Sequence, residues 1–130
     1  MAAMYDGLRV MFIEDDLAVR AATAQTLDLA GFEIEQHASA ESALKNLKEY
    51  FPGVLLVDFQ LTGMDGIALL ERAMTIDRSL PVIIVTGYAA VSLPTRKVEA
   101  ILEKPVSKEQ LLEKLRPIVA RWMDRSAGFP

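Results

Sequence analysis

The stretch that decides the fold is Val54–Asp58 (VLLVD), in which four aliphatic residues lead directly into a carboxylate. An apolar run of this length without polar alternation is typical of a central parallel strand that is buried on both faces. Pro52 and Gly53 stand immediately before the run and separate it from the preceding helical pattern. We therefore expect a buried strand whose carboxyl end carries a charged side chain.

Segments of strand length alternate with helix-period segments on both sides of this run. The expected strands are Leu8–Ile13, Phe32–His37, Val54–Val57, Pro81–Val85 and a segment near Val98–Leu102. The expected helices are Ala18–Ala30, a stripe from Ala40 to Phe51, about Asp65–Ile76, and a last helix that begins at Ser107. This alternation predicts an α/β fold, a doubly wound parallel sheet with helices on both faces.

Several residues mark where these helices begin and end. Gly31 stands where a C-cap glycine is expected, and Ser39 can N-cap the next helix. Ser107 and Gln110 have the spacing of a capping box. Pro117 lies inside the last helical pattern, where it should kink the helix or end its regular part.

The second expected strand has a different character from the third. Phe32 and Ile34 alternate with Glu33 and Glu35, which predicts an edge strand with one wet face. His37, the single histidine of the chain, closes this strand and is interpreted as a surface side chain rather than a ligand.

The bulk properties limit the classes of protein. The chain has 130 residues, of which 52% are hydrophobic and 25% charged, as is typical of one globular domain. A net charge of −4 makes direct binding of nucleic acid by this domain a poor hypothesis, because phosphate contacts need a basic face. The absence of cysteine excludes disulfides and thiolate chemistry, and no segment has the pattern of a signal peptide or the length of a membrane span. We expect a cytoplasmic protein with one domain at 1–124, followed by a tail or the start of a linker at 125–130.

Polar and charged side chains stand at the carboxyl ends of four of the five expected strands. They are Glu14, Asp15 and Asp16 after the first strand, Asp58 after the third, Thr86 after the fourth and Lys104 after the fifth. In a doubly wound sheet, ligands bind beyond these strand ends, where the strand order reverses. Clustered carboxylates favour a hard cation such as Mg²⁺, and a carboxylate can also accept a phosphoryl group. A lysine and a threonine hydroxyl would then stabilise the anionic group.

Each of these residues also has an ordinary structural explanation. Acids such as Asp15 and Asp16 often cap a helix. Asp58 could begin a turn, and Lys104 could be a solvated surface lysine. No single residue decides between the two interpretations, but all of them at the right strand ends, in the right chain order, favour a site.

Four segments together resemble the signature blocks of response-regulator receiver domains. They are VMFIEDD at 10–16, VLLVDFQLTGMDG at 54–66, PVIIVTGYA at 81–89 and LEKP at 102–105. The resemblance extends from about Arg9 to Trp122. It implies the CheY-like (flavodoxin-like) doubly wound sheet of five strands in the order 2-1-3-4-5. It also implies that Asp58 takes a phosphoryl group from the phosphohistidine of a kinase.

The resemblance implies a metal site for Mg²⁺ or Mn²⁺. Asp15 and Asp58 would bind the ion directly, and Glu14 would bind it through water. Gln60 would contribute its backbone carbonyl, whereas Asp16 would be an additional acid that caps the first helix.

The resemblance also implies a set of residues that bind the phosphoryl group. Thr86 and Lys104 would bind its oxygens, and Gly87 would leave room for a close approach. Pro105 would follow a cis peptide bond, which is admissible because the bond precedes proline.

The chain departs from the family pattern between the fourth and fifth strands. Ile101 occupies a switch position, three residues before the signature lysine, that is usually aromatic. The segment from Thr86 to Lys104 is about one helical turn shorter than in many members, and Pro94 argues against a long helix there. We therefore expect intact phosphorylation chemistry and a shortened fourth helix.

Other classes of function stay open at this point. A phosphatase or hydrolase with an aspartyl nucleophile generally has a second acid two residues later, but here that residue is Gln60. A nucleotide-binding module is less favoured still, because no GxxxxGK[ST] or GxGxxG loop is present. An interaction domain that works without phosphorylation is supported only by the unusual stretch at 89–96.

The resemblance predicts a signalling phosphoacceptor rather than an enzyme. Its partners would be a sensor histidine kinase or a phosphotransfer protein, and an output domain could be attached in a longer protein. Homodimerisation stays open, whereas neither a membrane nor nucleic acid is expected to bind this domain.

Overall fold

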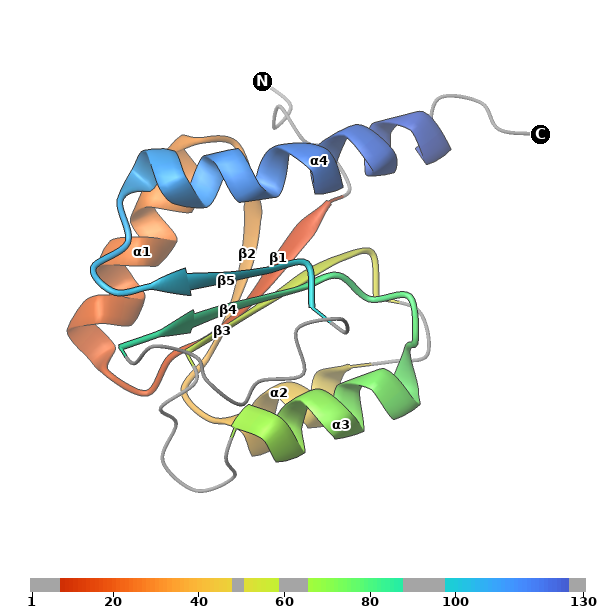
Figure 1. The fold of residues 1–130 in the computed structure, drawn as a ribbon. Coiled ribbons are helices and arrows are strands. Elements are labelled where there is room, and N and C mark those ends of the chain that lie inside the picture. The colour runs from red at the N-terminus through yellow and green to blue at the C-terminus, as the bar shows by residue number, and fades with distance from the viewer. Residues whose placement is uncertain (1–7, 48–50, 59–65, 88–97, 127–130) are drawn as a thin grey trace.

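The computed structural model describes residues 8–47, 51–58, 66–87 and 98–126. Strands and helices alternate up to the fourth strand, and the described residues then continue with a fifth strand and a last helix (Figure 1). The elements are β1 (Arg9–Ile13), α1 (Leu17–Leu29), β2 (Glu33–His37), α2 (Ala40–Asn46), β3 (Gly53–Asp58), α3 (Gly66–Ile76), β4 (Val82–Thr86), β5 (Ala100–Glu103) and α4 (Lys108–Ser126).

The five strands form one parallel sheet in the order β2-β1-β3-β4-β5. This confirms the predicted α/β class and the predicted strand order. The shortened helix expected between β4 and β5 falls within 88–97, outside the described residues. In the described ranges, no helix combines the length and the apolar character that are needed to cross a bilayer.

The core has two halves, one on each face of the sheet, because alternate residues of a strand point to opposite faces. Met11, Leu55 and Ile84 belong to the half that includes residues of α2 and α3. Val10 and Leu56 belong to the half that includes residues of α1 and α4. Figure 1 shows these two helix pairs on opposite sides of the sheet. Every residue of β3 is buried, as the apolar run predicted.

Three of the local signals for helix boundaries are confirmed. The side chain of Ser39 accepts a hydrogen bond from the backbone N–H of Ser42 and caps α2. Ser107 and Gln110 form the reciprocal capping box, with N–O distances of 2.8 and 3.1 Å. Gly31 has a φ of 102°, a left-handed conformation that favours glycine after a helix.

The end of one helix was predicted wrongly. Helix α2 stops at Asn46, because Leu47 already has an extended backbone (φ −79°, ψ 123°). Phe51 nevertheless belongs to the same half of the core, so its apolar character reported burial rather than helix. Helix α4 continues through Pro117 to Ser126, so of the two predicted effects of this proline, a kink or an end of the regular helix, the end is wrong. The buried side chains of Leu115 and Ile118, on either side of the proline, anchor this helix to the sheet.

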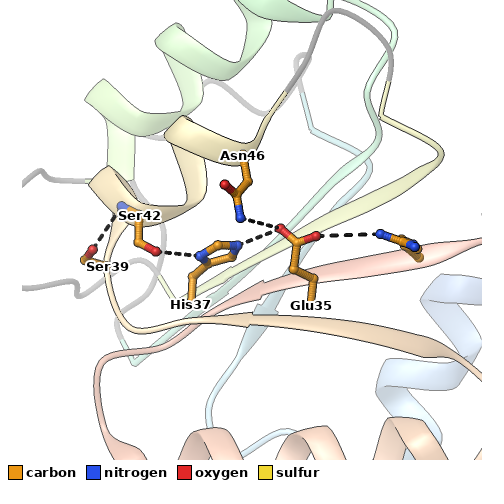
Figure 2. Close-up of polar contacts among 6 residues, drawn as sticks. Glu35, His37, Ser39, Ser42 and Asn46 are labelled. Carbon is orange, nitrogen blue, oxygen red and sulfur yellow. Dashed lines mark hydrogen bonds and ion pairs between the residues drawn. The ribbon is translucent and has the colours of Figure 1, made fainter.

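His37 is buried, with 6% of its surface exposed, so its interpretation as a surface side chain was wrong. Its strand is the edge of the sheet, but helix α2 lies against this end of the strand (Figure 2). The two ring nitrogens lie 2.7 Å from Ser42 Oγ and 2.7 Å from Glu35 Oε2. The histidine therefore connects β2 to α2.

Candidate functional site

Neighbouring strand ends bring three carboxylates together. Strands β1 and β3 pair with Ile13 opposite Val57, so the next residues, Glu14 and Asp58, leave the sheet side by side. Glu14 and Asp58 are 3% and 4% exposed, respectively. One carboxylate oxygen from each of Glu14, Asp15 and Asp58 lies within 4.8 Å of the others. An oxygen cluster of this size and charge fits a hard divalent cation such as Mg²⁺.

Lys104 provides a positive charge at the same place. Its ammonium nitrogen Nζ donates a hydrogen bond to Oδ2 of Asp58 at 2.8 Å. The backbone N–H of Lys104 donates to the carbonyl of Thr86 at 2.8 Å, which ties the end of β5 to the end of β4. The Lys104–Pro105 peptide bond is cis, as the resemblance implied.

The electrostatics of the pocket follow from burial and close charges. Burial raises the pKa of Glu14 from 4.5 to about 7, and its hydrogen bond with Asp58 adds to this rise. The backbone N–H of Asp16 and the charge of Lys104 oppose the rise only in part. Burial would lower the pKa of Lys104, but the Asp58 hydrogen bond and the surrounding carboxylates outweigh it, so this pKa is raised. The pocket therefore has a charged lysine and one carboxyl group that holds a proton close to neutral pH.

The remaining predicted site residues lie around this pocket, in the core or outside the described residues. Thr86 is 2% exposed at the end of β4. Gly87 and Pro105 line a cavity together with Asp58 and Lys104. Ile101 is half-buried and packs against the half of the core that α2 and α3 cover. Gln60 lies outside the described residues.

The cavity at these carboxylates has a volume of about 590 Å³. Residues from α1 and from the start of α4 form its walls, among them Val19, Thr23, Lys108 and Leu111. The space is large enough for a side chain of another molecule to approach Asp58 between the two helices.

One contact of the site has no signal in the sequence. Arg20, in the first turns of α1, donates a hydrogen bond from Nη1 to the backbone carbonyl of Glu14 at 2.7 Å. An arginine six residues after a site acid belongs to no motif that identifies it, so only the structure reveals the contact.

Comparisons with known proteins agree with this geometry. The family model described as "Response regulator receiver domain" matches residues 10–116. The C4-dicarboxylate transport transcriptional regulatory protein DctD of Rhizobium meliloti (strain 1021) is 35% identical over 111 residues, which are 82% of this chain and 24% of DctD. The response regulator receiver protein CpdR of Brucella abortus (strain 2308) is 30% identical over 115 residues, which are 85% of this chain and 96% of CpdR.

A solved structure has the same fold as this chain. The CheY-like receiver domain protein from Methanospirillum hungatei JF-1 superposes with a TM-score of 0.82 at 30% identity and covers 91% of this chain and 98% of that one. The chain thus spans about a quarter of DctD and nearly all of CpdR and of the Methanospirillum domain. With its sheet order and its pocket of acids, the chain belongs to the response regulator receiver domains, the CheY-like family of two-component signalling.

Proposed function

We propose that this chain is a phosphoacceptor that takes a phosphoryl group onto Asp58 from a sensor histidine kinase or a histidine phosphotransfer protein. The observation that supports the proposal best is the surrounding of Asp58, a buried carboxylate between two further acids and 2.8 Å from the ammonium group of Lys104. A nucleophilic carboxylate, a site for a divalent cation and a fixed positive charge are the parts that phosphoryl transfer requires.

The proposed transfer is a single in-line displacement. A carboxylate oxygen of Asp58 forms a bond to phosphorus while the phosphorus–nitrogen bond of the donor histidine breaks, and the electron pair of that bond returns to the ring nitrogen. Lys104 binds a phosphoryl oxygen, and its charge balances the negative charge that develops on the group. The hydroxyl group of Thr86 donates a hydrogen bond to another phosphoryl oxygen. Water later attacks phosphorus and releases inorganic phosphate, which regenerates the Asp58 carboxylate.

The metal site of the proposal consists of Asp15 and Asp58 directly, Glu14 through water, and the backbone carbonyl of Gln60. The described carboxylates fit Mg²⁺ or Mn²⁺, because three oxygens converge within 4.8 Å. When bound, the ion neutralises charge on the phosphoryl oxygens and on the clustered acids.

The proposal extends to the location and the partners of the domain. We place the domain in the cytoplasm. The donor histidine approaches through the cavity between α1 and the start of α4. Phosphorylation changes a protein–protein surface, with Ile101 as the switch residue. DctD is a transcriptional regulatory protein of which this chain matches 24%, so an attached output domain is one route for the signal. CpdR, matched over 96% of its length, is a receiver protein that supports a stand-alone mode.

The proposal is tested by intact-mass measurement after incubation with a small acyl-phosphate donor and Mg²⁺. We expect one phosphate adduct in the native protein and none in Asp58→Asn, because an amide cannot act as the nucleophile. Asp28→Asn, on the exposed face of α1, is the matched control and should be modified like the native protein. An adduct that persists in Asp58→Asn, or a folded native protein that is never modified, would contradict the proposal.

The affinity for Mg²⁺ should rise with pH through the range in which Glu14 titrates. Glu14 has a pKa of about 7, so below this pH its proton must leave before the ion binds well. We expect a loss of affinity that approaches about tenfold per pH unit well below that pKa, because one proton is exchanged. Calorimetric titrations in two buffers of different ionisation enthalpy would measure the released proton, which Glu14→Gln should abolish.

The same pKa should make the metal-free protein less stable at neutral pH than in mild acid. A carboxyl group whose folded pKa is raised from 4.5 to about 7 contributes stability that is fully present below pH 4.5 and is lost as the pH rises through about 7. Thermal unfolding of the metal-free protein should therefore show this loss, and Mg²⁺ should offset it. An affinity and a stability that do not change across this range would contradict the assignment.

A further inference from the structure

Residues outside the carboxylate pocket hold the backbone of Glu14 on both sides. We infer that Arg20 and His37 are positioning residues, which fix the acids of the β1–α1 turn in the arrangement that binds the metal. This inference rests on the proposed function for its consequence, but the contacts that carry it are independent of the metal.

Arg20 holds the carbonyl side of this turn. Its guanidinium Nη1 lies 2.7 Å from the Glu14 carbonyl oxygen, a short hydrogen bond from a charged donor. That carbonyl belongs to the peptide bond between Glu14 and Asp15. Holding the plane of this peptide restricts the directions in which the two acid side chains leave the backbone.

His37 holds the amide side. The backbone N–H of Glu14 donates to the carbonyl of His37 at 3.0 Å, one residue beyond the last pair of the β1–β2 ladder, Ile13 with His37. The position of this carbonyl depends on the histidine ring, which lies between the two oxygen partners shown in Figure 2, Ser42 Oγ and Glu35 Oε2. The ring is buried, and its hydrogen bond with Ser42 connects the end of β2 to α2.

Glu35 is itself held in place by its surroundings. Asn46 Nδ2, at the last residue of α2, lies 3.4 Å from Glu35 Oε2, and Arg9 Nη1 of β1 lies 3.9 Å from Glu35 Oε1. The chain of contacts therefore extends from β1 through Glu35 and His37 to α2, and the His37 carbonyl connects it to Glu14, directly after β1.

The arrangement has a physical purpose because the acids repel one another. Carboxylates within 4.8 Å of each other favour any movement that separates them. The side-chain oxygen Oε2 of Glu14 also accepts a hydrogen bond from the N–H of Asp16 at 3.1 Å, so amide, carbonyl and carboxylate of this residue are all held. Removing a group that orients a metal-binding residue commonly lowers the metal affinity by about 10- to 100-fold.

The first test compares Mg²⁺ affinity in Arg20→Met, Arg20→Lys and Arg121→Met. We expect Arg20→Met to weaken binding about tenfold, and Arg20→Lys to restore part of the affinity, since an ammonium group can still donate to the carbonyl. Arg121 is exposed and paired with Glu99, and Arg121→Met removes the same charge without touching Glu14. Weakening of equal size in both methionine variants would reduce the effect to net charge and overturn the inference.

The second test separates positioning from general stability. Ser42→Ala removes one partner of the His37 ring, whereas Ser39→Ala removes only the N-cap of α2. We expect both to lower the melting temperature, but only Ser42→Ala to weaken Mg²⁺ binding by a few-fold.

Amide hydrogen exchange of Glu14 in the metal-free protein gives a readout that does not depend on the ion. We expect it to accelerate in Arg20→Met and Ser42→Ala but not in Ser39→Ala or Arg121→Met, because opening of the turn exposes this amide. Unchanged exchange and unchanged affinity in Arg20→Met and Ser42→Ala would overturn the inference. If the native protein fails to bind Mg²⁺, the proposed function fails, and amide exchange still decides whether the turn is held as inferred.

Discussion

Lys104→Met should slow the phosphorylation of Asp58 by about 100-fold or more at saturating Mg²⁺, the size of effect seen when one fixed donor to a transition-state oxygen is removed. The ammonium group lies 2.8 Å from Asp58 Oδ2, so it stands where the phosphoryl oxygens arrive in the proposed transfer. Methionine keeps much of the length of the side chain but donates no hydrogen bond and has no charge. The rate is measured by following the phosphate adduct over time with a small acyl-phosphate donor.

The same variant should also change the pKa of Glu14. Lys104 lowers the pKa of Glu14 through its charge, so its removal should raise that pKa above its native value of about 7. Lys108→Met is the matched control, because Lys108 lines the same cavity at the start of α4. A rate in Lys104→Met that stays within about threefold of the native rate would remove the lysine from the transfer step.

Gly53→Ala should destabilise the fold by about 3 kcal/mol, at the upper end of what overpacking costs. A Cβ atom on Gly53 would lie 1.8 Å from the carbonyl oxygen of Arg9 and 2.7 Å from its carbonyl carbon. Both atoms are backbone of β1, next to β3 in the middle of the sheet. Arg9 cannot move away easily, because its N–H also donates to the carbonyl of Pro52 at 2.9 Å.

Urea unfolding followed by circular dichroism measures this loss. The free energy of unfolding of such a domain is typically about 5–15 kcal/mol, so the loss is a large fraction of it. In a thermal scan, a loss of about 3 kcal/mol corresponds to a melting temperature about 10 °C lower. Gly31→Ala is the comparison, because its φ of 102° imposes backbone strain of about 1–2 kcal/mol. A cost for Gly53→Ala no larger than that for Gly31→Ala would show that the two strands can separate at this point.

The order of strands and helices could be predicted from the sequence because burial leaves a periodic pattern in it. The run at Val54–Val57 predicted the central strand, although the strand itself extends from Gly53 to Asp58. The cap residues Ser39 and Ser107 act on amides within three residues, so their contribution is also local. The prediction of the last strand is less accurate, since Ala100–Glu103 begins two residues after the expected start at Val98.

The candidate site was predictable to the extent that it consists of strand ends. Parallel strands place their carboxyl ends at one edge of the sheet, and the structure brings Glu14, Asp15 and Asp58 together there with Lys104. The roles of these residues in phosphoryl transfer remain predictions. The ion pair between Lys104 and Asp58 joins residues 46 positions apart, so its distance depends on the packing of β3, β4 and β5.

What the sequence determined, then, was every property that depends on neighbours along the chain: burial period, caps, and which acids follow which strand. The tertiary structure alone decided the burial of His37, the early end of α2 and the contact of Arg20 with Glu14. The physical reason is that burial and hydrogen bonding depend on which groups are close in space. The packing of α1 and α2 against the sheet creates those distances, and no single segment encodes them.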